Sequence, residues 1–401
     1  MESSDFSFMD FDLSEVASNG CFPVLNIALE NLDLYSFDVN FPDKKRYCLL
    51  HYAAEKGNVE TTTKLLKLKA FPNVLNAEGR TPLHLACQHK HLVVVKLLLQ
   101  NKALINARDY RGETPISLAV RNQDLAIIKL LISEGADIAS RNNIKATLLH
   151  VSAEVGDRGL VEFFISEGFD VNFQTVCGDT PLTLAIKNGN TEVVDTLINS
   201  YNCDYNITDH KHCNLIHIAI KHKHVDTCKQ LMRLKNIDIN AVINSDGACP
   251  LHLAAEINCP EIIKLLIENQ AEINRKDYDG YTPLHIAATY KNNSKAVETL
   301  VKLNASINLI TINGDLPLHR AAASGNEKGV MLLYRKEFLT WRNRRGYTPI
   351  ALAEENGRIS VVYLLRNLEG DDNSSHNGFK KRVTFTGIPV PKRERKSILD
   401  D

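Results

Sequence analysis

The chain has 401 residues, of which 44% are hydrophobic and 24% are charged, and its formal net charge is −1. A nearly neutral chain produces no overall field that attracts nucleic acid or an anionic membrane, and no run of about 18 apolar residues is long enough to span a bilayer. Nine cysteines without a Cys-x-x-Cys pair are typical of reduced thiols rather than of a disulfide framework. We therefore expect a protein of the cytoplasm, the nucleus or both, without nucleic-acid or membrane partners.

The first 43 residues contain nine acidic side chains and no basic one. Within them, the segment SSDFSFMDFDLSEV alternates carboxylates with Phe6, Phe8, Met9, Phe11 and Leu13. A short segment of this composition cannot bury a core of its own, but it can fold in the groove of a partner. We expect residues 1–20 to be a disordered acidic-aromatic segment. A short docking helix of the kind found in activation domains is the alternative.

The rest of the chain is organised by a repeat of about 33 residues. Six-residue motifs similar to TPLHLA begin at Cys48, Thr81, Thr114, Thr147, Thr180, Asn214, Cys249, Thr282, Leu316 and Thr348. The first four steps between them are 33 residues long, and the later steps are 34, 35, 33, 34 and 32 residues long. Since one such unit is too small to bury its own apolar face, the period predicts a solenoid in which neighbouring units share a core.

The local chemistry predicts two helices in each unit. Thr81 is a good N-cap, and Pro82 suits the first helical position because its missing N–H has no partner to lose there. After a break at QHKH, the segment LVVVKLLLQ carries apolar residues on one helical face. The segment NKALINARDYRGE then supplies the Asn, Asp and Gly residues of a turn. Each unit is therefore expected to be a helix, a turn, a second helix and a hairpin-like loop.

The segment DYDGYTPLHIAATYKNNSKAVETLVKLNASIN, which begins at Asp277, resembles the ankyrin-repeat family. The resemblance implies an all-α solenoid of about ten helix-turn-helix repeats with hairpin loops, over residues 21–369. Residues 21–43 are expected to form a degenerate N-terminal cap, and residues 370–401 a disordered basic tail. The unit that begins NNIKATLLH lacks the turn glycine and the proline, which is either tolerated drift or a loop shaped for function.

The resemblance to this family implies a protein-binding scaffold rather than an enzyme. The sequence contains no GxSxG, P-loop, HExxH or kinase motif, so we assign no catalytic residue and expect no metal or cofactor. Seven histidines occupy the fourth position of the TPLH-like motif, where an imidazole can hydrogen-bond to the backbone at the start of the helix. A client protein is expected on the concave face, and residues typical of binding hot spots mark two patches: Tyr110, Arg111, Tyr278 and Tyr281 in one, and Trp341, Arg342 and Arg344 in the other.

The C-terminal tail contains the segment KKRVTF, which resembles the RVxF docking motif of protein phosphatase 1 regulators. The resemblance assigns Lys381 and Arg382 as the basic lead and Val383 and Phe385 as the anchors. In a strand added to a sheet edge, alternate side chains face the same way, so both anchors would enter one groove. The implied partner is the phosphatase catalytic subunit. In the myosin-phosphatase targeting subunits this motif precedes the repeats, so their detailed architecture does not carry over.

The same tail has two other interpretations. The basic residues fit a bipartite nuclear localisation signal, formed by Lys380, Lys381, Lys392, Arg393, Arg395 and Lys396. They also fit a plain solvated tail. Thr384 and Ser397 follow basic residues and are candidate phosphorylation sites. We expect a monomeric regulatory or targeting subunit of protein phosphatase 1, with a nuclear ankyrin adaptor or transcriptional cofactor as the alternative.

Overall fold

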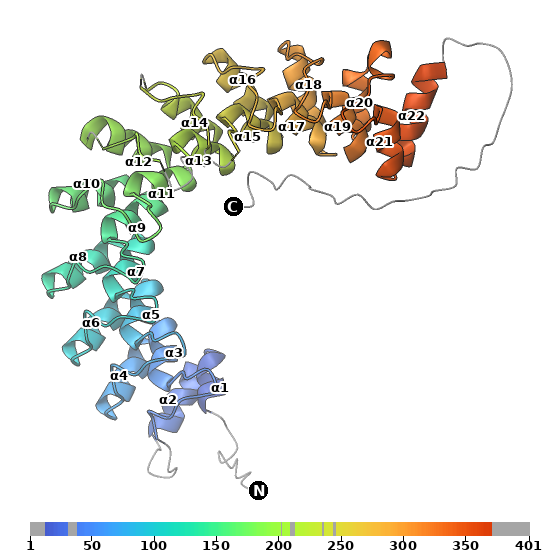
Figure 1. The fold of residues 1–401 in the computed structure, drawn as a ribbon. Helices are drawn as coiled ribbons and strands as arrows, with labels where there is room; N and C mark the ends of the chain where they lie inside the picture. The colour runs from blue at the N-terminus through green and yellow to red at the C-terminus, as the bar shows by residue number, and fades with distance from the viewer. Residues whose placement is uncertain are drawn as a thin grey trace, which may run out of the picture. The chain divides into compact units, whose positions relative to one another are not determined.

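The structure is a computed structural model that describes residues 13–30, 38–201, 203–208, 213–234, 236–243 and 246–370. In these ranges the regular secondary structure is helical, and contacts divide the chain into two compact units, Met1–Cys203 and Asp204–Asp401. Each unit is a stack of antiparallel helix pairs joined by loops (Figure 1). The prediction of an all-α repeat solenoid is confirmed.

The described residues of the first unit form six helix pairs, and a π-helical turn at Thr196–Ser200 extends the last helix. Its helices are α1 (Leu13–Ser18), α2 (Phe22–Glu30), α3 (Leu49–Glu55), α4 (Val59–Lys67), α5 (Pro82–Gln88), α6 (Leu92–Gln100), α7 (Pro115–Arg121), α8 (Leu125–Ser133), α9 (Leu148–Val155), α10 (Arg158–Ser166), α11 (Pro181–Lys187) and α12 (Thr191–Asp195).

Where the structure describes the second unit, it has five helix pairs, with a 3₁₀ turn at Lys336–Phe338 before the last pair. Its helices are α13 (Leu215–Lys221), α14 (Val225–Leu231), α15 (Pro250–Glu256), α16 (Pro260–Glu268), α17 (Pro283–Thr289), α18 (Ser294–Lys302), α19 (Pro317–Ser324), α20 (Glu327–Leu333), α21 (Pro349–Glu355) and α22 (Ile359–Gly370).

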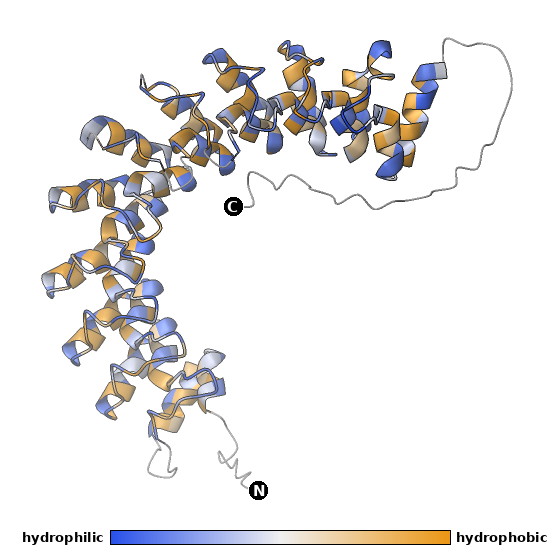
Figure 2. Cartoon of the chain, viewed as in Figure 1, coloured by the Kyte–Doolittle hydropathy of each residue, from blue (hydrophilic) through white to orange (hydrophobic). Residues whose placement is uncertain are grey.

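In both units the first helix of each pair packs on the first helix of the next pair, and the second helices form a parallel row. Leu83 on α5, Ile116 on α7 and Val94 on α6 are fully buried between these rows. Burying side chains of this size stabilises each interface by about 1.5–3 kcal/mol per residue. Figure 2 shows hydrophobic residues along every helix pair of the two units, so the core is a continuous layer that runs through each stack.

The first helices begin where the sequence pattern predicts. Thr81 has an extended backbone, its hydroxyl accepts a hydrogen bond from the backbone N–H of His84, and Pro82 occupies the first turn. The same arrangement starts α11 at Thr180 and α17 at Thr282. Capping of this kind is worth about 1 kcal/mol at each helix.

The N-terminal cap begins earlier than the sequence indicated. Helix α1 lies inside residues 1–20, the segment expected to be disordered, and it packs against α2 and α3. It is ordered because Ala17 is fully buried in the stack, as is Leu25 on α2. The pair α1–α2 therefore forms an eleventh repeat. The first residues of this pair belong to the sequence segment that alternates acidic and apolar residues. Residues 1–12 lie outside the described ranges.

The repeat that begins NNIKATLLH keeps the fold of the neighbouring repeats. Lys145 occupies the position of the missing turn glycine and adopts a left-handed backbone with φ of +63°. Helix α9 starts after Thr147 without a proline and is capped by interactions between Thr147 and His150. The missing glycine and proline are therefore tolerated without loss of the hairpin or the helix.

Candidate protein-binding surface

Several hairpin loops are held rigid by a polar side chain at their first position. In the hairpin 109–113, the carboxylate of Asp109 accepts hydrogen bonds from the backbone N–H groups of Arg111 (2.9 Å) and Glu113 (2.8 Å). Gly112 completes the turn with φ of +76°, a conformation that glycine adopts without steric cost. Asn76 makes the equivalent contacts with the N–H groups of Glu78 and Arg80 in the preceding hairpin.

Successive hairpins are joined to one another by backbone hydrogen bonds. In the first unit, the N–H of Tyr110 donates to the carbonyl of Glu78 (3.1 Å), and the N–H of Asn143 donates to the carbonyl of Arg111 (3.0 Å). In the second unit, the donors Tyr278, Ile312 and Arg344 bond to the carbonyls of Asp246, Asp279 and Asn313, each at 2.9 Å. The hairpin tips of each unit therefore form a continuous, preorganised row.

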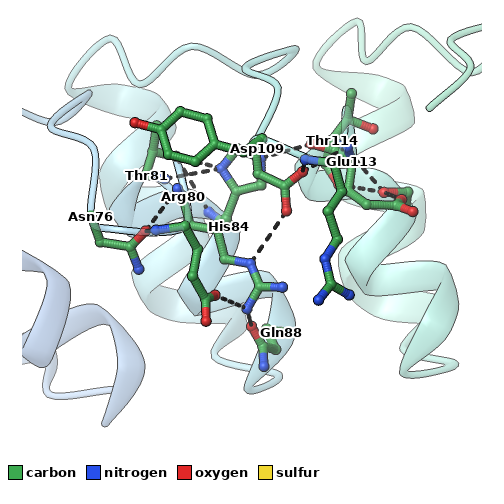
Figure 3. Close-up of polar contacts among 12 residues, drawn as sticks. Asn76, Arg80, Thr81, His84, Gln88, Asp109, Glu113 and Thr114 are labelled. Carbon is green, nitrogen blue, oxygen red and sulfur yellow. Dashed lines mark hydrogen bonds and ion pairs between the residues drawn. The ribbon is translucent and has the colours of Figure 1, made fainter. Parts of the chain in front are cut away.

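In several repeats the histidine of the TPLH motif fastens the first helix to the next hairpin. In His84, Nδ1 accepts a hydrogen bond from the N–H of Thr81 (3.1 Å), and Nε2 donates to the carbonyl of Glu113 (3.1 Å), as Figure 3 shows. His252 and His285 bond in the same way to the carbonyls of Tyr281 and Asp315. Burial lowers the pKa of His51 to about 4 and that of His285 to about 3. These imidazoles are neutral structural groups.

A network of charged side chains covers the hairpins beside the first helices of the first unit (Figure 3). The guanidinium of Arg80 contacts Glu78 (2.7 Å), Asp109 (3.4 Å) and the side-chain oxygen of Gln88 (3.0 Å). The carboxylate of Asp109 is almost fully buried, whereas that of Glu78 is exposed. The network therefore fixes the shape of the surface rather than offering free charges to a ligand.

Aromatic side chains stand on the hairpin tips in both units. Tyr110 and Tyr278 are each 59% exposed. Their rings lie directly over Gly79 and Gly247 of the preceding hairpins, where an added Cβ would come within 2.6 Å of the ring. One face of each tyrosine is thus packed and the other is free, which lowers the entropy cost of binding a partner.

Trp341 in the second unit is held in a similar way. The indole is 42% exposed, and its Nε1–H donates a hydrogen bond to the carbonyl of Gly314 (3.2 Å). The neighbouring side chains of Arg342 and Arg344 are exposed, and the guanidinium of Arg342 donates to the carbonyl of Gly346 (2.8 Å). The segment that leads into hairpin 343–347 therefore offers a fixed aromatic ring beside positive charge, a combination found at binding hot spots.

In the part of the chain that the structure describes, side chains able to bind a metal ion are scattered rather than clustered. No three His, Cys, Asp or Glu side chains are grouped there as metal ligands, and no helix there is long and apolar enough to cross a membrane. None of the nine cysteines, all of which the structure describes, forms a disulfide bond. Burial raises the pKa of Cys48 to about 11 and that of Cys228 to about 12, so neither thiol is poised for nucleophilic attack.

Comparison with known proteins agrees with this geometry. A family model described as ankyrin repeats (3 copies) matches residues 13–109, 50–142, 149–243 and 216–311, which together make up more than half of the chain. The chain belongs to the ankyrin-repeat family. Ankyrin repeats are generally non-catalytic modules for protein interaction, so this protein is a protein-binding scaffold.

Three relatives illustrate the breadth of the similarity. The BTB/POZ domain and ankyrin repeat-containing protein NH5.2 of Oryza sativa subsp. japonica is 35% identical over 71 residues, 18% of this chain and 14% of that protein. Inversin of Canis lupus familiaris is 28% identical over 209 residues, 50% of this chain and 19% of that protein. The nuclear factor NF-kappa-B p105 subunit of Mus musculus is 34% identical over 115 residues, 28% of this chain and 12% of that protein. The matched segments thus span at most 19% of these relatives.

Not every residue expected to bind a client lies on the ankyrin surface. Tyr281 is only 7% exposed, and its assignment to the client patch is wrong. Its ring packs edge-on against His285 at 5.9 Å, with the guanidinium of Arg320 5.4 Å from the ring centroid. Tyr281 directly precedes the N-cap Thr282, so its side chain turns into the stack while that of Tyr278 stays at the tip.

The other expected client residues fall into two groups. Tyr110 and Arg111 belong to the first unit, whereas Tyr278, Trp341, Arg342 and Arg344 belong to the second. The client patch that the sequence predicted from Tyr110, Arg111 and Tyr278 is therefore divided between the two units. Within the second unit, Tyr278 and Arg344 occupy equivalent hairpin positions.

The tail sites lie outside the described residues, which end at Gly370. This applies to the docking residues, the phosphorylation candidates and the import residues: Lys380, Lys381, Arg382, Val383, Thr384, Phe385, Lys392, Arg393, Arg395, Lys396 and Ser397.

One surface was missed when the sequence was considered alone. Phe41, Phe71, Leu75 and Leu104 are 65%, 61%, 44% and 60% exposed and lie in three consecutive loops of the first unit. The sequence carried a signal for this surface. Phe71 and Leu104 stand two residues before Asn73 and Asn106, and most other repeats have Asp at the position that Phe71 and Leu104 occupy.

Proposed function

We propose that this ankyrin protein is a regulatory or targeting subunit of protein phosphatase 1. The observation that carries the proposal is the segment KKRVTF, which follows the end of α22 at Gly370. It pairs Val383 with Phe385 directly behind Lys381 and Arg382. The repeats are complete before this segment begins, so their stacking does not require either apolar side chain.

The docking step would use strand addition. An extended segment that pairs with the edge of a sheet presents Val383 and Phe385 to one groove, while Thr384 faces the other way. Burying each anchor contributes roughly 1.5–3 kcal/mol. After the cost of ordering the segment, this corresponds to an affinity of about micromolar for the motif alone.

In this proposal the repeats bind the client protein. The exposed rings of Tyr110, Tyr278 and Trp341 are already fixed against neighbouring hairpins, and Arg111, Arg342 and Arg344 provide charge beside them. A client bound to the tips of either unit would share one chain with the tethered phosphatase. Tethering raises the effective concentration of the enzyme at the client to about millimolar.

The proposal is tested by affinity capture from cells that express the full chain or the variant Val383→Ala/Phe385→Ala. The unmodified chain should recover the phosphatase catalytic subunit, and the variant should lose it while retaining its other partners. Retention of the phosphatase by the double variant would refute the proposed docking motif.

A nuclear ankyrin adaptor or transcriptional cofactor is the second candidate. It is favoured by the two basic clusters that contain Lys380 and Lys392, and one of the relatives is a nuclear factor NF-kappa-B p105 subunit. Replacing Lys392, Arg393, Arg395 and Lys396 by Ala should then abolish nuclear entry. That result, together with failure of the unmodified chain to recover phosphatase, would favour the adaptor.

A further inference from the structure

Two adjacent loops of the first unit carry apolar residues at a position that is polar elsewhere. The position is identified by a hydrogen bond from its backbone N–H to an Asn side chain in the preceding loop. Phe71 donates to Asn40 (2.8 Å), Leu104 donates to Asn73 (2.7 Å), and Asp137 donates to Asn106 (2.8 Å). Phe71, Leu104 and Asp137 are therefore structurally equivalent, yet only the first two are apolar.

The polar residues at this position stabilise their own loops. In each case the carboxylate accepts a hydrogen bond from the backbone N–H two residues later, at 2.8–3.0 Å, in Asp38, Asp137, Asp170, Asp204 and Asp238. Phe71 and Leu104 cannot accept this bond, and both side chains are more than half exposed. Local stability and burial thus both favour Asp at this position, which indicates that the apolar side chains serve an interaction.

The two residues belong to a larger surface, which we call the apolar loop patch: Phe41, Phe71, Leu75 and Leu104. The loops that carry it are contiguous, because Asn40, next to Phe41, bonds to Phe71, and Asn73, in the loop of Leu75, bonds to Leu104. Contiguous exposed apolar surface of this kind marks an interaction site.

Positive charge borders the apolar loop patch. Lys67 at the end of α4, and Lys69 and Lys102 in the loops of the patch, are exposed, and the described part of the chain places no carboxylate within ion-pair distance of any of them. Lys64 on the same helix differs, since it pairs with Glu30 (2.6 Å) and Glu60 (2.9 Å). The chemistry of the patch suits a segment that combines large apolar side chains with carboxylates.

We propose that residues 1–12 of this chain dock on the apolar loop patch. Besides Met1, this segment contains four carboxylates and four large apolar side chains, namely Glu2, Asp5, Asp10 and Asp12, with Phe6, Phe8, Met9 and Phe11. It matches the patch in charge and in apolar character. The proposal is independent of the phosphatase, because it concerns the opposite end of the chain.

The point where the segment joins the fold places it near the patch. Residue 12 precedes α1, which packs beside α3 in the equivalent position of the next repeat. The N-terminus of α3 is capped by Cys48, whose Sγ donates to the carbonyl of Asn40 (3.1 Å), next to Phe41. The start of α1 is therefore at the same end of the stack as the patch, and twelve extended residues reach about 40 Å.

The test uses the full chain with p-benzoyl-phenylalanine in place of Phe8 and maps its photo-crosslinks by mass spectrometry. Crosslinks should form within one chain and fall in residues 67–75 and 102–108. The variant Phe71→Asp/Leu104→Asp should lower their yield about tenfold, because both apolar contacts are replaced by carboxylates that repel an acidic segment. The melting temperature should not fall, because Asp restores the loop hydrogen bond seen at Asp137.

A matched control keeps the experiment specific. Val93→Asp/Leu125→Asp introduces the same charges at side chains that are 54% and 52% exposed on α6 and α8, outside the patch, and should leave the yield unchanged. Crosslinks elsewhere in the chain, or a yield that is insensitive to Phe71→Asp/Leu104→Asp, would overturn the proposal. Crosslinks only between chains would also overturn it, since a second copy would then supply the segment.

Discussion

At the scale of single residues, Lys145 shows how much one backbone conformation matters to a hairpin. Its φ of +63° is the left-handed region that Gly79, Gly112 and Gly178 occupy in the neighbouring hairpins. A side chain with a Cβ is strained there by about 1 kcal/mol. We predict that Lys145→Gly raises the free energy of unfolding by about 0.5–1 kcal/mol, measured by urea denaturation.

Lys129, an exposed residue in the middle of α8, provides the matched control. There the same Lys→Gly change should lower stability by about 1 kcal/mol, because glycine is a poor helix former. Equal effects of the two substitutions would show that the conformation of Lys145 carries no strain.

The buried histidines make stability depend on pH. Burial lowers the folded-state pKa of His51 to about 4 and that of His285 to about 3. In the unfolded chain both histidines have a pKa of about 6.5, so the unfolded chain binds protons at these two sites more readily than the folded chain does. The stability that neutral His provides is therefore complete above about pH 6.5 and is lost as the pH falls toward 4, by about 1.4 kcal/mol per unit for each group.

We predict that the urea midpoint falls between about pH 7.5 and about pH 5. His285→Gln should lower stability at the higher pH but flatten this dependence, because one titrating group is removed. A midpoint that stays constant over this range would contradict the assignment of the histidines as buried neutral groups.

At the scale of elements, the stability of hairpin 109–113 depends more on its first side chain, Asp109, than stability depends on the surface ion pair between Glu78 and Arg80. Asp109→Ala removes two hydrogen bonds to backbone N–H groups and a partner of Arg80, so we expect a loss of about 2–3 kcal/mol in the free energy of unfolding. Glu78→Ala removes only an exposed ion pair with Arg80 and should cost less than about 0.5 kcal/mol. Denaturation curves in which both variants lose the same stability would contradict this ranking.

The sequence predicts most of these elements because their signals are local. Thr81 and Pro82 mark the start of α5 through capping and a fixed φ, and the same two-residue signal recurs at α7, α11 and α17. The start of α1 escaped prediction because Ala17 is ordered by burial against the next repeat, not by its neighbours in sequence. The π-helical turn at Thr196–Ser200 likewise has no local signal that we can identify.

The candidate surface was less predictable than the fold. Tyr278 and Tyr281 stand in the same short sequence DYDGY, yet one is 59% and the other 7% exposed, and only the geometry of the hairpin separates them. The apolar loop patch had a sequence signal in the positions of Phe71 and Leu104, and hydrogen bonds then showed that both residues are structurally equivalent to Asp137.

At the scale of the whole molecule, the proposed function has two parts. The repeats bind a client protein, and the tail recruits the phosphatase. Such a tether can be switched by charge. Phosphorylation of Thr384 would add a charge of about −1.5 to −2 between the two docking anchors. We predict that a tail peptide phosphorylated at Thr384 binds the phosphatase catalytic subunit at least about tenfold more weakly than the unmodified peptide, as measured by fluorescence anisotropy. Equal affinity of the two peptides would exclude this switch.

The most direct measurement is a calorimetric titration of the purified phosphatase 1 catalytic subunit into the full chain and into Val383→Ala/Phe385→Ala. The account predicts one-to-one binding to the unmodified chain with a dissociation constant of about micromolar or tighter, and affinity lower by at least about tenfold in the variant. Absence of binding to the unmodified chain, or equal binding to both chains, would contradict it.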